Sequence, residues 1–307
     1  MLKDRPEVTV VMVSFHSIKL IVKPINCIDK EINIIVVENS NSKECKDFLE
    51  KKFPNVKVIL SEKNLGNGGG INLGLKQVKT KYAFYLDIDT EIKEDTIKNL
   101  LIASTEIDNF TILAPLVENY KYKKVDYFES SIMENKEHKL MSFVPGCAIF
   151  FNMEKILQIG FFDENFFLFF EENDIYMRCL KNNHKIYLIQ AAKMIHTGEM
   201  SVDKKYDLDI ELIRNWHYMW SKFYFYKKHF NIYTAYRETL GHFFSGLVKL
   251  LFFLFLNKKN YLKYKFRVLG LLNSYLGKKS WKRPSEKVPV ASKKEPVETR
   301  QGARSAA

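Results

Sequence analysis

Two acidic residues stand two positions apart directly after an apolar segment. Asp87 and Asp89 follow residues 82–86, which we expect to form a buried strand. In an open α/β sheet, ligands bind at the carboxyl ends of the parallel strands, where these carboxylates would lie. Carboxylates there can hold a hard divalent cation, and the cation can bind a diphosphate. Taken alone, the pair fits a solvated turn before the helix expected at Asp95 better than it fits a metal site, because D-x-D occurs by chance in many loops.

A histidine follows a later strand. His196 comes after the strand expected at 185–189, in the segment MIHTGEMS, and its neighbours Gly198 and Ser201 indicate a loop rather than a core element. A lone histidine is usually structural, but a neutral imidazole can complete a carboxylate metal site. Manganese accepts such mixed nitrogen and oxygen ligands more readily than magnesium does.

A glycine-rich segment, NLGNGGGINLG, spans Asn64–Gly74. Its glycines would let the backbone approach a ligand closely, and the N–H groups before the helix expected at 70–79 could face a phosphate. A dinucleotide-binding fingerprint should instead follow the first strand, which here ends in Ser14-Phe15-His16. The flanking asparagines favour a specific packed turn over a flexible loop.

Two more sets of acids could act on a ligand. Glu38 ends the second expected strand, where a carboxylate could bind a ribose hydroxyl or a base N–H, or simply mark a polar strand end. Glu171, Glu172 and Asp174 follow the aromatic run GFFDENFFLFF and would lie in the first turn of a helix at 171–182. They could stabilise the helix dipole, or one of them could be a general base that removes a proton from an acceptor hydroxyl.

The elements that must position these residues read as an α/β fold. Short apolar runs without alternation predict strands that are buried on both faces, and helical segments lie between them. The expected strands are 8–15, 32–37, 56–60, 82–86, 143–151 and 185–189, and the expected helices are 43–52, 70–79, 95–104 and 171–182. Residues 120–140 are polar and read as a surface excursion.

Composition narrows the class of protein and its compartment. The chain has 307 residues, a net charge of +12 and 46% hydrophobic residues, which suits a soluble α/β domain with an extension. Its four cysteines form no C-x-x-C pair, so we expect free thiols in the reducing cytosol. Residues 1–7 lack the apolar run of a secretory signal, so we expect the catalytic part to lie on the cytoplasmic side.

The C-terminal part differs from the rest. Aromatic residues stud a helix expected from residue 209 onward, and the apolar run 243–256 is short for a membrane span, which favours a buried or interfacial helix. Lysines alternate with tyrosines after it, as suits an anionic leaflet. We therefore expect a catalytic domain at 1–208, a membrane-associating helical extension at 209–283 and a disordered tail at 284–307. The tail's composition also suggests that its end does not come from the natural protein.

Taken together and in order, these features resemble the inverting family 2 glycosyltransferases, and most closely their rhamnosyltransferase-like and galactofuranosyltransferase-like branch. The resemblance covers about Val8 to Ser201. The family's glycine run is matched by Asn64, Gly66, Gly68, Gly69, Asn72 and Gly74, its D-x-D motif by Asp87 and Asp89, its aromatic–acidic block by Gly160–Asp174, and its metal histidine by His196. The chain departs from the pattern at Asn67, where an aromatic residue is common, at Ile88, where proline is common, and at Glu171-Glu172, where the family has Glu-Asp.

The resemblance implies a GT-A fold, with a mixed, mostly parallel sheet flanked by helices. It implies that the nucleotide-sugar donor is bound by the side chains and backbone of Ser14, Glu38, Asn64, Gly68, Gly69, Asn72 and Asp87. It also implies that Asp89, Asp87 and His196 hold Mn²⁺ or Mg²⁺, and that Glu172, with Glu171 beside it, is the catalytic base of a single inverting displacement. The expected donor is a dTDP- or UDP-sugar, and the expected acceptor is a lipid-linked oligosaccharide or a surface polysaccharide at the inner face of the cell membrane. A homodimer stays open, and no nucleic-acid partner is expected.

Three alternatives stay open. A catalytically silent module that binds a glycan or a protein partner could share the fold, although the intact acids and His196 argue against it. A sugar nucleotidyltransferase would carry a glycine- and arginine-rich loop after the first strand, where this chain has Ser14, His16 and Lys19. A nucleic-acid-binding protein is suggested only by the charge, because no zinc-finger or RNA-recognition signature is present.

Overall fold

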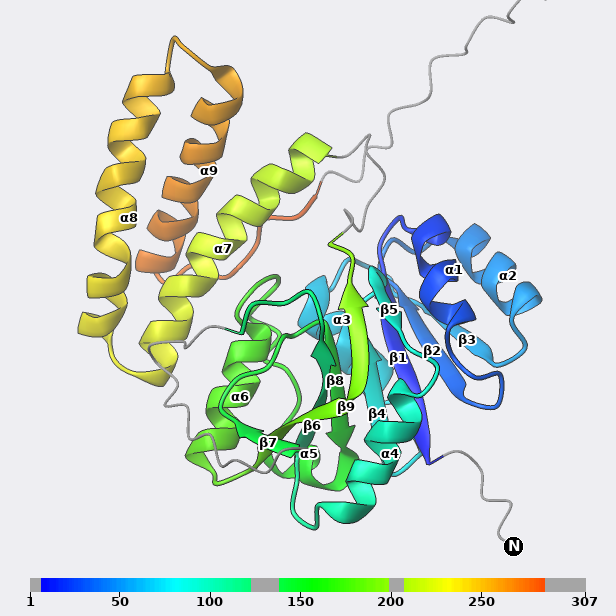
Figure 1. Cartoon of the computed structure of the whole chain (residues 1–307). Coiled ribbons are helices and arrows are strands. Elements are labelled where there is room, and N and C mark those ends of the chain that lie inside the picture. Colours follow the sequence, from blue (N-terminus) through cyan, green and yellow to red (C-terminus); the bar gives the residue numbers. More distant parts are fainter. Residues whose placement is uncertain (1–6, 123–137, 199–206, 285–307) are drawn as a thin grey trace, which may run out of the picture.

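A nine-stranded sheet forms the centre of the molecule, with helices on both faces and a helical extension beside it (Figure 1). The computed structural model describes residues 7–122, 138–198 and 207–284. The main path of the sheet runs β3-β2-β1-β4-β8-β6-β9-β5, and β7 pairs with β9. Residues 123–137, within the expected surface excursion, and residues 285–307, within the expected tail, lie outside the described residues.

The N-terminal half of the sheet is parallel. Strand β1 pairs in parallel with β2 on one side and with β4 on the other, and β2 pairs in parallel with β3. Helices connect the consecutive strands. Strands β1 and β2 are rich in valine and isoleucine, and β4 is made mainly of aromatic residues. Nearly all residues of these three strands are buried, as expected for a parallel sheet that is covered on both faces. The bounds of this half are β1 Val8–Ser14, α1 Ile18–Asn26, β2 Asn33–Glu38, α2 Lys43–Lys52, β3 Val56–Leu60, α3 Gly66–Leu75 and β4 Tyr82–Leu86.

The second half mixes directions. Strand β8 runs antiparallel to both β4 and β6, β6 is parallel to β9, and β5 and β7 are antiparallel to β9. Strands β1–β4, β6 and β9 therefore share one direction, which confirms the expected mixed, mostly parallel sheet. The bounds are β5 Thr90–Ile92, α4 Thr96–Glu106, β6 Ile112–Val117, β7 His138–Met141, β8 Ala148–Asn152, α5 Met153–Ile159, α6 Glu171–Lys181 and β9 Ile186–His196.

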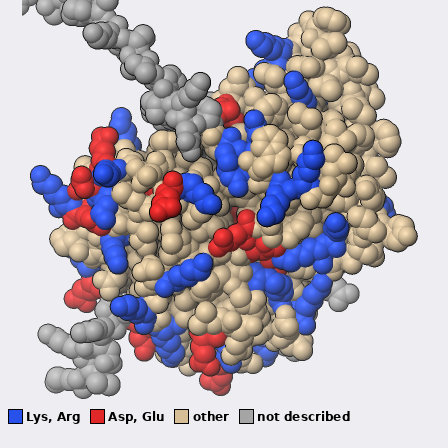
Figure 2. All heavy atoms as spheres, turned by 180° about the vertical axis from the view of Figure 1, so that it is seen from behind, with Lys and Arg blue, Asp and Glu red and all other residues tan. Residues whose placement is uncertain are grey.

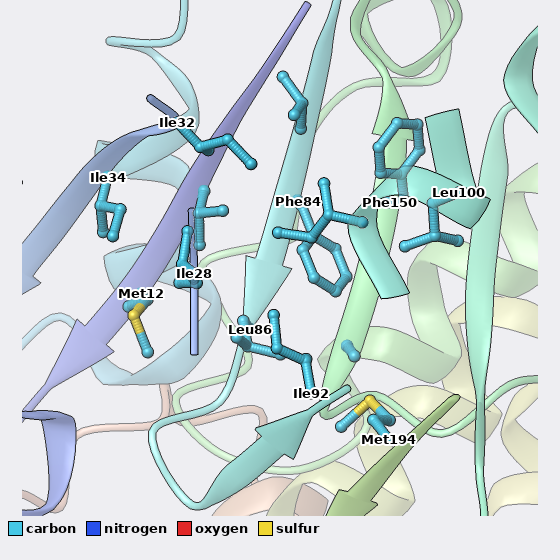
Figure 3. Packing of buried hydrophobic residues seen from close by; sticks show 14 of the residues in the cluster. Met12, Ile28, Ile32, Ile34, Phe84, Leu86, Ile92, Leu100, Phe150 and Met194 are labelled. Atoms are coloured by element: carbon cyan, nitrogen blue, oxygen red, sulfur yellow. The ribbon is translucent and has the colours of Figure 1, made fainter. Parts of the chain in front are cut away.

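Two hydrophobic cores lie on the two faces of this sheet. On one face, alternate side chains of β1 and β4, such as Met12 and Phe84, pack with Phe150 of β8 and Leu100 of α4 (Figure 3). On the other face, Val11 and Tyr85 pack under α3, α6 and α7. Because both faces are covered, the strands hold their carboxyl ends in a fixed arrangement at one edge of the sheet.

Three long helices form the extension, namely α7 Asp207–His229, α8 Ile232–Phe253 and α9 Lys258–Tyr275. Helix α7 packs between α6 and the α8–α9 hairpin, and the aromatic residues Trp216 and Phe223 of α7 are buried there. The sequence predicts that the run 243–256 is either buried or interfacial. The buried interpretation is wrong, because most of the large side chains of this run are exposed. Within the described ranges, no helix has both the length and the apolar character that a membrane span requires.

Candidate active site

A cavity of about 480 Å³ opens at the carboxyl ends of the strands. Its floor is made of residues that follow β1, β2 and β4 and of the last residue of β9, while the starts of α3 and α6 form its walls. The lining includes Val13, Phe15, Asn39, Asn64, Gly66, Asn67, Asp87, Asp89, Gly146, Phe167, Phe169, Glu171, Glu172, His196, Ile213 and Arg214. The structure thus brings the D-x-D acids, the aromatic–acidic block and the histidine to one place.

Asp87, Asp89 and His196 form a cluster in this cavity. One potential ligand atom from each lies within 4.8 Å of the others, and His196 Nε2 is 3.2 Å from Asp89 Oδ1. The expected loop around His196 is wrong, because β9 continues to this residue and pairs Thr90 with His196. The strand continues because β5 lies beside it and supplies backbone partners. The backbone N–H of Thr197 also donates to Asp89 O at 2.9 Å.

The electrostatics of the cluster suit a cation. Burial, together with the negative charge of Asp89, raises the pKa of Asp87 to about 7, although the hydrogen bond from Tyr85 acts in the opposite direction. The hydrogen bond to Asp89 raises the pKa of His196. Two close carboxylates with one imidazole form a mixed oxygen and nitrogen donor set that fits Mn²⁺ or another divalent ion of similar chemistry. The residues present therefore fit the metal that the sequence predicts.

Glu171 and Glu172 begin helix α6 in the same cavity. Phe169 and Phe170 before them have φ values of +66° and +69°, so the chain turns sharply into the helix. Glu171 is buried, and burial together with the charge of Glu172 raises its pKa to about 8. Glu172 is half-buried against Gly146, and burial raises its pKa as well. Glu172 is therefore the more accessible of the two carboxylates.

A polar chain joins these acids to the metal cluster. Asn67 donates from Nδ2 to Glu171 Oε1 at 3.1 Å, and its Oδ1 lies 3.1 Å from the Tyr85 hydroxyl, which also hydrogen-bonds Asp87. The sequence prediction missed both Asn67 and Tyr85 as site residues. The departure from the family pattern at Asn67 was the available signal, whereas Tyr85 looks in the sequence like any other strand residue.

The glycine run is mostly a helix, and the expected turn before a helix is wrong. Helix α3 begins at Gly66, whose φ is +77° and where a Cβ would come within 2.2 Å of Phe167 O. Gly68 lies against Phe162 and Glu171, and Gly74 against Val11 of β1. The glycines therefore let α3 pack closely on the sheet and on the aromatic block. Gly68 and Gly69 are buried and do not line the cavity, whereas Gly66 does.

Two asparagines of this run have different positions. Asn64 lines the cavity, and its Oδ1 accepts from Gly66 N at 2.9 Å, which shapes the entry into α3. Asn72 does not line the cavity. Its amide accepts from Phe162 N and donates to Phe162 O, both at 2.9 Å, so it clamps the aromatic block to α3.

Glu38 and Ser14 also do not line the cavity. The carboxylate of Glu38 accepts from Ser40 Oγ, Ser40 N and Ser42 N, so both of its oxygens shape the loop after β2. Ser14 is fully buried at the end of β1. Their neighbour Asn39 takes the expected place in the cavity, and its Nδ2 donates to Gly66 O at 2.9 Å.

A charged cluster behind α6 holds the helix in place. Asp174 is buried and accepts from His229 at 2.7 Å and from Arg178 at 2.9 Å, and Lys228 lies 2.5 Å from it. The guanidinium of Arg178 also donates to the carbonyl oxygens of residues 159–161. The cluster ties α6, α7 and the start of the aromatic block together, and so it positions Glu171 and Glu172 without facing the cavity.

Helix α7 also borders the cavity. Ile213 and Arg214 belong to its lining, and the Arg214 guanidinium lies 5.3 Å from the centre of the Phe169 ring. The segment after α9 returns along α7 and places Arg283 over the Phe167 ring at 3.9 Å. The boundary expected at residue 208 thus does not separate the cavity from the helical extension.

The chain is similar in sequence to known glycosyltransferases. Residues 9–160 match the family model described as glycosyl transferase family 2. The low-salt glycan biosynthesis hexosyltransferase Agl10 of Haloferax volcanii is 24% identical over 208 residues, which cover 62% of this chain and 67% of that protein.

Solved structures share the fold over most of this chain. A mannosyltransferase from Pyrobaculum calidifontis, PcManGT, superposes with a TM-score of 0.54 at 12% identity, covering 90% of this chain and 89% of its own. Residues 1–349 of TarS from S. aureus superpose with a TM-score of 0.52 at 16% identity, covering 88% and 92%. Identities this low show the fold alone. The sequence match therefore shows that residues 9–160 are similar to glycosyl transferase family 2, and the solved structures show a shared GT-A-like fold.

Proposed function

We propose that this chain is an inverting glycosyltransferase that moves a hexose or deoxyhexose from a UDP- or dTDP-sugar to a hydroxyl of a glycan under construction. The observation that carries the proposal is the convergence of Asp87, Asp89 and His196 with Glu171 and Glu172 on one cavity. The similar proteins add support: PcManGT was solved with GDP-Man and Mn²⁺, TarS with UDP-GlcNAc, and Agl10 is named a hexosyltransferase of glycan biosynthesis.

Each side chain has a role in this proposal. Asp89, Asp87 and His196 would hold a divalent cation, which when bound neutralises the charge that grows on the leaving diphosphate. Glu172 accepts the proton of the acceptor hydroxyl as that oxygen bonds to the anomeric carbon, and the bond from this carbon to the diphosphate breaks on the opposite face. Glu171, held by Asn67, supports the position of Glu172. A rhamnose or galactofuranose donor is the narrower form of the proposal.

The acceptor completes the proposal. We assign the reaction to residues 1–208 together with the cavity-lining part of α7. The acceptor is a lipid-linked oligosaccharide or a surface polysaccharide at the cytoplasmic face of the cell membrane, where sugar nucleotides are available.

Calorimetry with a panel of nucleoside diphosphates and their sugars, with and without manganese, tests the proposal. We expect one nucleotide to bind only with the metal, and we expect Asp89→Ala to weaken this binding at least about a hundredfold. Asp108→Ala, at an exposed acid distant from the cavity lining, is the matched control. If no nucleotide binds under any condition, the transferase is ruled out and a silent binding module takes its place.

A second variant separates chemistry from binding. Glu172→Gln should keep donor binding within about twofold and lower turnover by at least about a hundredfold, because general-base catalysis contributes 10²–10⁴-fold. The anomeric configuration of the product, read by NMR, checks inversion. A product that retains the donor's configuration would contradict the single displacement.

A further inference from the structure

The end of the α8–α9 hairpin is an apolar surface that no part of the described chain covers. Helix α8 has its last buried residue at Gly246, and α9 has its first at Val268, so no residue from 247 to 267 is buried. We define these 21 residues as the hairpin tip. Below the tip the helices pack closely, since a Cβ at Gly246 would come within 2.8 Å of Val268.

Large apolar side chains gather on the tip. The exposed fractions are 93% for Phe255, 72% for Leu251, 67% for Leu256 and 62% for Phe252. Between the two helices of the tip, Phe253 stacks on Tyr264 with 5.8 Å between the ring centres. Leaving side chains of this size in water is unfavourable, and a contiguous group of them marks a site of interaction.

The charged residues of the tip itself are all basic, and one of them, Lys259, pairs with Glu211 of α7 at 2.9 Å. Residues 239–283 contain no Asp or Glu, and they contain ten basic residues, namely Lys249, Lys258, Lys259, Lys263, Lys265, Arg267, Lys278, Lys279, Lys282 and Arg283. Lys258 and Lys259 are exposed directly after the apolar turn. Figure 2 shows the hairpin from behind as a mostly tan surface with blue side chains near its top. An apolar edge with a lysine rim complements a bilayer whose headgroups are anionic.

The place of the tip in the fold agrees with this partner. In Figure 1 the turn between α8 and α9 lies toward the same side of the molecule as the carboxyl end of β9, which carries His196. A membrane under the tip would therefore lie on the side toward which the cavity's strand ends point.

We propose that the hairpin tip is a membrane anchor: the turn around Leu251–Leu256 inserts among the acyl chains at the interface, and Lys258, Lys259 and their neighbours bind anionic phospholipid headgroups. The anchor goes beyond the proposed transferase reaction, because it uses none of the residues in the cavity. In this proposal the turn between α8 and α9 binds the membrane, and neither helix lies along the membrane surface over its whole length.

Sedimentation of the full chain with vesicles tests the anchor. Wild-type protein should bind phosphatidylcholine vesicles that contain phosphatidylglycerol at least about tenfold more tightly than pure phosphatidylcholine vesicles, and salt should weaken the binding. Phe255→Asp combined with Leu251→Asp should reduce binding by at least about a hundredfold, because two large apolar side chains would no longer insert. Lys258→Glu combined with Lys265→Glu should abolish most of the preference for the anionic lipid, because both lysines are exposed.

Leu157→Asp provides the matched control. Leu157 is 64% exposed on α5 and lies outside the tip, so this variant should bind vesicles like the wild type. If the wild type does not bind anionic vesicles, or if the tip variants bind as tightly as the wild type, the anchor is refuted. A concentration-dependent dimer that Phe255→Asp dissociates, without vesicle binding, would instead assign the tip to a second copy of this chain and would also refute it.

Nucleotide binding by the same variants keeps this test separate from the transferase proposal. The tip variants should bind the donor like the wild type in the absence of vesicles, because their side chains do not line the cavity. Loss of vesicle binding with intact donor binding supports the anchor. Vesicle binding by a wild type that binds no nucleotide would overturn the transferase and leave the anchor standing.

Discussion

Asn67 donates a hydrogen bond to Glu171 across 3.1 Å, from the first turn of α3 to the first residue of α6. The other oxygen of Glu171 has no hydrogen-bond partner among the described residues, so Asn67 is the side chain that holds this buried carboxylate. The same amide contacts Tyr85, which in turn hydrogen-bonds Asp87. The position of the acids at α6 is thereby linked to that of the acids after β4.

Replacing Asn67 should disturb catalysis more than binding. In Asn67→Ala the Glu171 carboxylate stays buried without its donor, a loss of the order of 1–3 kcal/mol for a buried polar group. We expect kcat to fall roughly tenfold while KM for the donor changes less than about threefold. Steady-state kinetics check this, with Asn109→Ala at an exposed turn as control. If kcat/KM instead falls about tenfold because KM rises while kcat stays unchanged, Asn67 binds substrate and does not position Glu171.

Removal of the imidazole should weaken the metal site selectively. His196→Ala takes away one of the three candidate ligand groups, and we expect the manganese concentration that half-saturates donor binding to rise roughly tenfold to a hundredfold. Titration of donor binding with manganese measures this. His242→Ala, at an exposed histidine of α8, should leave the titration unchanged. An unchanged midpoint in His196→Ala would remove the histidine from the ligand set.

The first glycine of α3 should tolerate no side chain. Gly66 combines a φ of +77° with a predicted Cβ contact of 2.2 Å to Phe167 O, so Gly66→Ala should lower the free energy of unfolding by about 3 kcal/mol. Gly241→Ala is the matched control, because it lies inside α8 with no atom within 4 Å of the added Cβ. It should raise the stability by about 1 kcal/mol. Urea unfolding of both variants checks the opposite signs.

Acid should remove the stabilising effect of Asp174. Burial by itself raises the pKa of Asp174, but His229, Arg178 and Lys228 outweigh it and lower the pKa from 3.8 to about 2. A carboxyl group whose pKa is lower in the folded state than in the unfolded state stabilises the fold at pH values above its unfolded-state pKa. This contribution to the free energy of unfolding disappears as the pH falls through the folded-state pKa of about 2. The shift corresponds to about 2 kcal/mol.

The free energy of unfolding of Asp174→Asn should therefore lie well below that of the wild type at neutral pH, and the difference should shrink by about 2 kcal/mol toward pH 2. Urea unfolding over this pH range measures it. Asp47→Asn, on the exposed side of α2, should show no such pH dependence of the difference. A difference that stays constant with pH would mean that the ionised carboxylate does not stabilise the fold.

Local patterns were enough to predict much of this molecule. The strands at 56–60 and 82–86 and the helix at 43–52 have the predicted bounds, because apolar runs and helical spacing depend on neighbouring residues only. The acids of the D-x-D segment follow the end of a predicted strand, and Glu171 and Glu172 stand at the start of a predicted helix, so both sets lie at element ends that the sequence marks, and both line the cavity. Residue types with their spacing therefore predicted which chemistry the site could perform.

The glycine run shows where local reasoning stopped. A helix over Gly66–Leu75 contradicts the low helix propensity of glycine, and it forms because the absent side chains let α3 approach β1 and the aromatic block. The same holds for His196, which extends β9 only because β5 pairs beside it. In both cases the stabilising partner is distant in the sequence.

The sequence by itself determined the fold class, which carboxylates follow the strand at 82–86 and begin the helix at 171, and the basic, aromatic character of the C-terminal part. Only the tertiary structure decided which polar residues face the cavity: Asn39 rather than Glu38, and Asn67 in addition to the acids. It also placed the buried Tyr85 hydroxyl within hydrogen-bond distance of Asn67. It also decided which part of the apolar run 243–256 stays exposed. The physical reason is that the partners of a side chain come from packing between segments that are distant in the sequence. A local pattern of residues therefore does not show which polar side chains are hydrogen-bonded within the fold and which face the cavity.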